Sequence, residues 1–204
     1  MPRRSPLTAL AALFAGTLAL IGCGSSSKSG VSAPAGSQPE SAAALAADAR
    51  SAATGDIPDN QNFLTLKDRR LRVSMLYPEG WTVKTSASGV TISDKNNLVR
   101  ISVAPGSTPT VSNVRARLAA LKSSTPGLTA GTPQAIALKS GAAVKAVYTT
   151  QSAPNPVTGK RVSLTVDRYE LAHGGRVATI DLGTPVGVDN VDAYRRMIES
   201  FRWQ

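Results

Sequence analysis

The fold is decided by the stretch Arg70-Leu71-Arg72-Val73-Ser74-Met75-Leu76-Tyr77-Pro78-Glu79-Gly80-Trp81. Apolar side chains at every second position of residues 71–77 predict a half-buried strand, which turns Arg70 and Arg72 to the opposite face. Residues 78–80 then supply turn chemistry, and Trp81 opens a second short strand. Two strands joined by so short a turn indicate an antiparallel sheet.

The same alternation recurs along the rest of the chain. It predicts further strands at residues 89–93, 98–103, 142–150, 161–171 and 176–182, with a shorter candidate at 134–138. A long exposed loop, residues 152–159, joins two of these strands, and a tight turn at residues 173–175 joins the last two. The order is typical of an antiparallel meander.

Two segments change to a helical period. Residues 109–122 place apolar side chains at spacings of three and four, as expected for a helix that packs one stripe on a sheet: Val111, Val114, Leu118 and Leu121. A final helix starts near Asp189, whose carboxylate can cap the free amides. The apolar stripe of this helix is Val191, Tyr194, Ile198 and Phe201.

These elements predict an α+β fold over residues 61–204, in which a mostly antiparallel sheet of about seven strands is sandwiched with helices. A domain of ~145 residues buries roughly 68% of the surface of its unfolded chain, so it needs no disulfide to be stable. We expect Trp81, Tyr77 and Phe201 to fill the core.

Residues 1–22 have the parts of a lipoprotein signal peptide: a basic start, an uncharged apolar run from residue 7 to 21, and the lipobox-like sequence Leu20-Ile21-Gly22-Cys23. The small Gly22 fits the signal peptidase site, and the Cys23 thiol receives a diacylglycerol and becomes the first residue after cleavage. The apolar run is shorter than the ~20 residues of a transmembrane helix. We therefore expect an extracytoplasmic protein, anchored by lipid to the outer face of the bacterial cell membrane, with the Sec and Tat export routes both open.

Residues 23–60 are rich in Ser, Ala, Gly and Pro and predict a flexible tether. They carry two basic and four acidic residues, whereas residues 61–204 carry 19 basic and 9 acidic residues, so the domain is the basic part. A basic domain next to a membrane meets anionic lipid headgroups and cell-wall polymers. Nucleic acid is not an expected partner, because aromatic residues for base stacking are few.

Catalytic signals are missing. One cysteine and one histidine argue against a disulfide scaffold and against a histidine-rich metal site. A phosphate-binding loop ending at residues 159–160 fails, because Arg161 stands where Ser or Thr is required. The strand carboxylates Asp94, Asp167, Glu170 and Asp181 are interpreted as the wet side of the sheet, and His173 as a turn residue. We expect no catalytic residue, no metal and no cofactor.

Basic residues offer the remaining candidate sites, for an anion or a protein partner. They form three pairs: Arg70 and Arg72 on one strand face, Lys160 and Arg161 beside the long loop, and Arg195 and Arg196 on the final helix. If the fold brings two pairs together, they make a binding patch. If it does not, they are scattered charges that keep the domain soluble.

The chain resembles the PsbP-like superfamily over about residues 62–203. The resemblance rests on Tyr77-Pro78-Glu79-Gly80-Trp81 after the first strand and on Ile198-Glu199-Ser200-Phe201-Arg202-Trp203 at the end. With the lipobox and tether, it is similar to the LpqN-type lipoproteins of actinobacteria. The resemblance implies an accessory or binding module, since relatives support the oxygen-evolving photosystem, bind the Ran GTPase or associate with envelope transport and assembly proteins. It transfers no catalytic or partner-binding residue.

Two functions follow as hypotheses. The first is a noncatalytic, lipid-anchored envelope protein whose domain binds another envelope protein, with the tether raising its local concentration at the membrane. The alternative is a carrier of a lipid or cell-wall precursor, which binds in a pocket between the sheet and the helices. A large dry pocket favours the carrier, and an exposed patch favours the protein partner.

Overall fold

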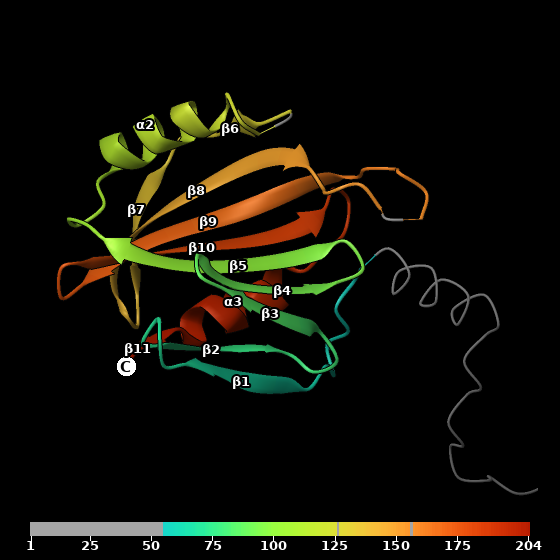
Figure 1. Ribbon diagram of the computed structural model, residues 1–204, viewed down its shortest axis with the longest axis horizontal. Coiled ribbons are helices and arrows are strands. Elements are labelled where there is room, and N and C mark those ends of the chain that lie inside the picture. The colour runs from blue at the N-terminus through green and yellow to red at the C-terminus, as the bar shows by residue number, and fades with distance from the viewer. Residues whose placement is uncertain (1–54, 126, 156) are drawn as a thin grey trace, which may run out of the picture. The chain divides into compact units, whose positions relative to one another are not determined.

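The computed structural model describes residues 55–125, 127–155 and 157–204 (Figure 1). The predicted signal peptide, Gly22, Cys23 and the tether up to residue 54 lie outside the described residues. Within the described part, no helix has both the length and the hydropathy needed to cross a membrane.

The secondary structure alternates long strands with two helices in the described part of the chain. In chain order the elements are β1 (Phe63–Asp68), β2 (Val73–Pro78), β3 (Thr82–Ser86), β4 (Gly89–Asp94), β5 (Asn97–Pro105), α2 (Val111–Leu121), β6 (Thr129–Ala130), β7 (Gln134–Leu138), β8 (Gly141–Gln151), β9 (Ser163–His173), β10 (Arg176–Pro185), α3 (Val191–Ser200) and β11 (Arg202–Trp203).

The strands form a large and a small antiparallel sheet. The eight-stranded sheet runs β3-β4-β5-β10-β9-β8-β6, with β7 also paired to β8, and the three-stranded sheet runs β1-β2-β11. Helix α2 covers the outer face of the large sheet, and α3 lies between its inner face and the small sheet (Figure 1). The predicted α+β fold with a mostly antiparallel sheet is confirmed.

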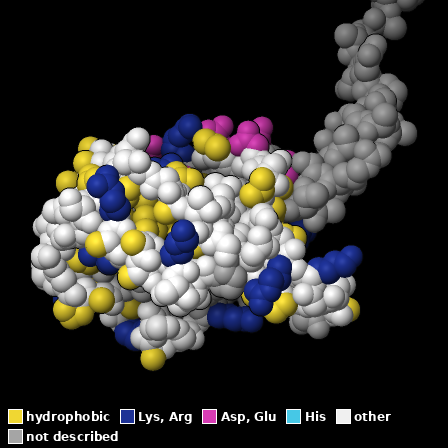
Figure 2. Space-filling model, turned by 90° about the horizontal axis from the view of Figure 1, so that it is seen from above, with side chains coloured by type: hydrophobic (Ala, Val, Ile, Leu, Met, Phe, Trp, Pro, Cys, Tyr) yellow, Lys and Arg dark blue, Asp and Glu magenta, His cyan; other side chains and the backbone are white. Residues whose placement is uncertain are grey.

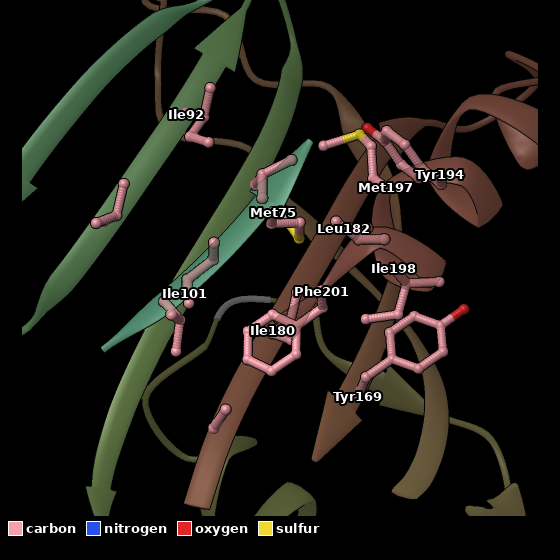
Figure 3. Close-up of a cluster of buried hydrophobic side chains, with 14 of the residues drawn as sticks. Met75, Ile92, Ile101, Tyr169, Ile180, Leu182, Tyr194, Met197, Ile198 and Phe201 are labelled. Carbon is pink, nitrogen blue, oxygen red and sulfur yellow. The ribbon is translucent and has the colours of Figure 1, made fainter. Parts of the chain in front are cut away.

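The main core lies between the two sheets and α3. Phe201 is completely buried there, together with Met75 from β2, Ile180 and Leu182 from β10, and Met197 from α3 (Figure 3). A second, smaller core lies under α2, where Val114 and Leu118 pack on β8 and β9. The predicted stripe of this helix is therefore correct. Trp81 is buried in the main core and Tyr77 is partly buried against it, as expected.

The first strand begins later than predicted. Residues 70–72 belong to a turn in which the Leu71 amide donates to the Asp68 carboxylate at 2.7 Å, and Arg72 has a positive φ of 54°. Apolar and polar residues alternate through this turn as they do along the strand, so the sequence pattern did not reveal the turn. The prediction that Arg70 and Arg72 share a strand face is wrong. Strand β1, with its weakly alternating burial, was not predicted.

The end of the predicted tether packs on the domain. Ile57 is buried in the main core, and its amide donates to the Asn190 side-chain oxygen at 2.8 Å. The Gly55 carbonyl accepts hydrogen bonds from Asn97 and Asn190 at 2.5 and 3.1 Å. Residues 55–60 thus carry the composition of a tether but the contacts of a folded segment.

Helix α3 differs from its prediction at its start. The N-cap residue is Asn190, whose side chain bonds elsewhere, while the Asp189 carboxylate accepts from the Val191 amide at 3.2 Å. The expected stripe holds for Tyr194, Ile198 and Phe201, but Val191 is 62% exposed. Val191 lies instead beside an open pocket between α3 and the large sheet.

Candidate functional site

Four chain segments that meet at one end of the two sheets are rich in arginine. The β1–β2 turn, the β3–β4 turn, the β9–β10 turn and β11 all lie at this end, on the left in Figure 1. Five arginines come from these segments, and we call them the arginine end: Arg69, Arg70, Arg72, Arg176 and Arg202.

Backbone contacts hold the arginine end together. The Arg176 guanidinium donates to the Leu71 carbonyl at 3.0 Å, and the Gln204 amide donates to the Arg72 carbonyl at 2.9 Å. Strand β11 pairs with β2, which places Trp203 opposite Val73. Segments separated by more than 100 residues in the chain are thus tied to one turn.

Arg70 links the β1–β2 turn to the β3–β4 turn. Its guanidinium donates to the carbonyls of Ser86 and Gly89 and lies 3.7 Å from the Asp68 carboxylate. The Arg70 side chain is still 45% exposed, whereas the Asp68 side chain is 8% exposed. The solvent at this turn therefore meets mainly the positive charge of the pair.

An aromatic cluster supports the arginine end. The Trp203 indole stacks on the His173 ring at 5.7 Å between centroids, and it meets the Phe201 ring edge-on at 5.5 Å. The Arg176 guanidinium carbon lies 5.2 Å from the Trp203 ring centroid, a cation–π arrangement. His173 is a turn residue, as predicted, and its ring completes this stack.

The structure keeps the first two predicted basic pairs apart. Arg70 and Arg72 lie at the arginine end, whereas Lys160 and Arg161 lie in the β8–β9 loop at the opposite end of the sheet. The Arg161 guanidinium donates to the Ser152 carbonyl at 2.7 Å within that loop. The predicted single patch is therefore not formed by these pairs.

The third pair, on α3, lines a surface hollow together with Lys139, Glu199 and Arg202. Arg195 forms an exposed ion pair with Asp192 at 2.8 Å, and the Arg196 guanidinium lies 4.3 Å from the Phe63 ring centroid. The arginines that do join Arg70 and Arg72 were missed. A usable signal existed for Arg176, because the predicted turn at 173–175 must lie at one end of an antiparallel sheet.

At the opposite end of the strands, one surface hollow has charged lining residues that are mainly acidic. It has a volume of about 480 Å³ and lies between the start of the described chain and the start of α3. Its charged lining residues are Asp56, Asp59, Asp189, Asp192 and Arg196, and we call this region the acidic end. Asn190 holds it in place through hydrogen bonds to the Gly55 carbonyl, to Asn97 and to Thr184.

A second hollow opens between α3 and the strands β8, β9 and β10, and we call it the α3 pocket. Its volume is about 400 Å³, and it is lined by Tyr169, Leu182, Val188 and Tyr194 together with polar groups. The Lys145 ammonium lies 2.7 Å from the Asp167 carboxylate at its edge. Burial lowers the pKa of Lys145, but the hydrogen bond and charge of Asp167 outweigh this and raise that pKa overall.

The outer face of the sheet carries buried ion pairs. Arg168 donates two hydrogen bonds to Asp181, at 2.7 and 2.8 Å, and Arg117 of α2 donates two to Glu170. Glu170 and Asp181 are buried, so the interpretation of these acids as solvent-facing is wrong. Burial, followed by the nearby Asp181 charge, raises the pKa of Tyr148 to about 12. The Arg168–Asp181 pair is therefore closed to a ligand, whereas the Arg117 side chain is 47% exposed.

The other basic residues on the outer side do not gather. Figure 2 shows Lys and Arg side chains spread singly over this face, while Asp and Glu side chains gather along one border. Among the described residues, no group of three or more His, Cys, Asp or Glu side chains is arranged to hold a metal ion. The arginine end and the α3 pocket are therefore the two candidate sites.

No family model and no curated protein sequence matches this chain. The fold is similar to that of cyanobacterial PsbP (CyanoP) from Synechocystis, with a TM-score of 0.53 and 14% identity, covering 74% of this chain and 98% of that one. A protein from Bacteroides thetaiotaomicron gives a TM-score of 0.45 at 14% identity, covering 69% of this chain and 48% of that one. The Ran-binding protein Mog1p from Saccharomyces cerevisiae gives a TM-score of 0.47 at 8% identity, covering 70% and 95%. The likeness to CyanoP confirms the expected PsbP-like fold.

Proposed function

We propose that this protein is a noncatalytic accessory protein of the bacterial cell envelope that binds an acidic envelope protein through its arginine end. In this proposal it is a lipoprotein of the LpqN type, and the lipid on Cys23 holds it on the outer face of the cell membrane. The signal peptide and lipobox in residues 1–23 support the anchor.

The observation that carries the proposal is that five arginines belong to the segments that meet at one end of the domain. The acidic residues near them are Asp68, with a side chain 8% exposed, and Glu199, which faces Lys139 at 3.8 Å. The surface potential of this end is therefore positive, which steers an acidic partner toward it and disfavours a basic one. Arginine also binds carboxylates with paired hydrogen bonds.

The aromatic cluster favours a protein partner over a simple anion. Trp203 is partly buried at this end and is stacked against His173 and Arg176. Tryptophan and arginine dominate the energetics of protein interfaces because they combine large contact area with directional polar groups. An anionic polymer would bind through the arginine charges alone and would not use the aromatic cluster.

The positions of the two ends of the domain also support a partner other than the membrane that anchors the protein. The described chain enters the domain at Gly55, which contacts Asn97 and Asn190 at the acidic end. The arginine end lies at the other end of the strands. A tether entering at the acidic end leaves the arginine end available to a neighbouring envelope protein.

A carrier of a lipid or cell-wall precursor is the second candidate function. The α3 pocket favours it, because it lies between sheet and helix as a carrier site requires. Its volume of about 400 Å³ is near the lower limit for small-molecule sites, and the core around Phe201 and Ile180 is filled by side chains (Figure 3). The room available favours the protein-binding role.

The test is crosslinking in living cells of the full-length lipoprotein, followed by mass spectrometry of attached proteins and copurified lipids. The test variant carries Arg70→Glu and Arg72→Glu. The matched control carries Lys160→Glu and Arg161→Glu, which changes the net charge by the same amount at the opposite end of the sheet. We expect the test variant to lose at least 90% of the crosslinked partner and the control to keep it.

Two results would overturn the proposal. Equal crosslinking by both variants would show that net charge, or another surface, governs binding. A stoichiometric copurified lipid with no reproducible protein neighbour would establish the carrier function instead. Membrane fractionation of a Cys23→Ala variant tests the anchor separately, and release of this variant from the membrane is the expected result.

A further inference from the structure

We propose that the α3 pocket binds a compact zwitterion with an apolar side chain, such as a free amino acid or a dipeptide. The site shares no residue with the arginine end, so the inference is independent of the proposed protein partner. It rests on the charges, the apolar wall and the size of the pocket.

The charged groups of the α3 pocket are balanced. Lys145 lies 2.7 Å from Asp167, and Arg195 lies 2.8 Å from Asp192, so each cation at the pocket has an acidic neighbour. A ligand with a net negative charge is repelled by Asp167 as it approaches Lys145. A ligand with a net positive charge is repelled by Lys145 as it approaches Asp167. A ligand that carries both charges satisfies both groups at once.

Both members of the Lys145–Asp167 pair are open to a ligand. Their side chains are 33% and 26% exposed, unlike the buried Arg168–Asp181 pair on the other face of the sheet. The contacts of Asp167 with Lys145 and with the Tyr169 hydroxyl both use Oδ2, so Oδ1 is the atom that takes a ligand ammonium. The Lys145 ammonium has three donors, and a ligand carboxylate takes one not given to Asp167.

The apolar wall stands on the other side of the pocket. Leu182 and Tyr194 are buried at its base, Val188 is half-buried, and Val191 is 62% exposed at its rim. A ligand that covers the exposed Val191 side chain removes apolar surface from water. The exposure of Val191 is the feature that the helical pattern alone did not explain.

The size of the pocket limits the ligand. About 400 Å³ is at the lower end of the range for small-molecule sites. This space admits one amino acid or a dipeptide and is too small to enclose a diacyl lipid. Thr165 also lines the pocket and brings a further hydroxyl group to it, whereas the Thr184 hydroxyl already bonds to Asn190 and Asn97.

The experiment is a titration of the full chain in lipid nanodiscs, followed by nuclear magnetic resonance of labelled Leu and Val methyl groups. The probes are L-leucine, L-phenylalanine and glycyl-L-leucine. We expect saturable shifts at the methyls of Leu182, Val188 and Val191. Two analogues of leucine, 4-methylpentanoate without the ammonium and 3-methylbutylamine without the carboxylate, should bind at least tenfold more weakly.

Two variants connect binding to the charges. Lys145→Met and Asp167→Asn should each weaken binding at least tenfold, while unchanged methyl shifts elsewhere report an intact fold. The matched control is Lys139→Met, since Lys139 is an exposed lysine outside the pocket. No saturable shift with any of the three probes would overturn the proposal. Equal binding of either singly charged analogue, or full binding by both variants, would overturn it as well.

Discussion

The arginine end and the hollow of the acidic end carry opposite charge and are built in different ways. The arginine end is assembled on aromatic rings, with Trp203 stacked against His173 and packed on the buried Phe201. The acidic end is assembled on amide hydrogen bonds, in which Asn190 bonds to the backbone of Gly55 and Ile57. Both charge clusters are therefore held against the folded domain, one by ring packing and the other by side-chain hydrogen bonds.

The difference shows which end is better suited to a macromolecular partner. A foundation of aromatic rings leaves large, partly exposed side chains beside the charges, as at Trp203. At the acidic end, the amide groups of Asn190 are used in hydrogen bonds within the protein. The side chains that remain exposed there are mainly carboxylates, such as those of Asp59 and Asp189. Protein interfaces are enriched in Trp and Arg and depleted in Asp, which favours the arginine end.

The largest change in stability should come from the aromatic residues that support the arginine end. Phe201→Ala removes a completely buried ring next to β11, so we expect a loss of about 3–5 kcal/mol in the free energy of unfolding. Urea denaturation of the variant measures it. Val191→Ala serves as the control, because this residue is 62% exposed and should change stability by less than about 0.5 kcal/mol. Equal losses would show that α3 does not pack as described.

The foundation of the acidic end should contribute less. Asn190→Ala leaves the Ile57 amide and the Gly55 carbonyl with fewer partners, and a buried group left without its hydrogen bond costs about 1–3 kcal/mol. Chemical denaturation again provides the measurement. A loss as large as that of Phe201→Ala would contradict the distinction drawn between the two ends.

A smaller and opposite change in stability is expected at Arg72. Its φ of 54° is a conformation that costs an L-residue about 1 kcal/mol and glycine almost nothing, so Arg72→Gly should raise the free energy of unfolding by up to that amount. The same variant should lower crosslinking to the partner several-fold.

The opposing signs separate binding from folding at this position. Lys95 is the matched control, since it also has a positive φ, of 51°, but lies in the β4–β5 turn at the other end. Lys95→Gly should leave crosslinking unchanged. A fall in crosslinking for both variants would remove Arg72 from the site.

The alternation of side chains was enough to predict most of the fold. Residues 89–93 and 176–182 matched β4 and β10, because apolar side chains alternate there with small or polar ones in the sequence. Strand β1 was missed because its exposed residues blur that period. The same alternation falsely extended a strand through the turn at residues 70–72.

The site was less predictable, because it depends on pairing between distant segments. Arg176 and Trp203 meet the β1–β2 turn only through the order of strands and the β2–β11 pairing. The burial of Glu170 likewise depends on Arg117 of α2, which the strand pattern cannot reveal. Charged residues along a strand indicate a solvent-exposed face unless a residue of opposite charge from another element pairs with them and allows their burial.

The smallest effect should come from the exposed pair at the border between the acidic end and the α3 pocket. Arg195 and Asp192 have side chains 60% and 83% exposed, so their attraction is screened by water and salt. Arg195→Ala should therefore change the free energy of unfolding by less than about 0.5 kcal/mol, as measured by urea denaturation. It should also leave crosslinking to the partner intact, because the charge of Arg195 is already paired with Asp192, although both line a hollow with Arg202. A strong loss of crosslinking would extend the binding surface along α3 and remove the contrast between the two ends.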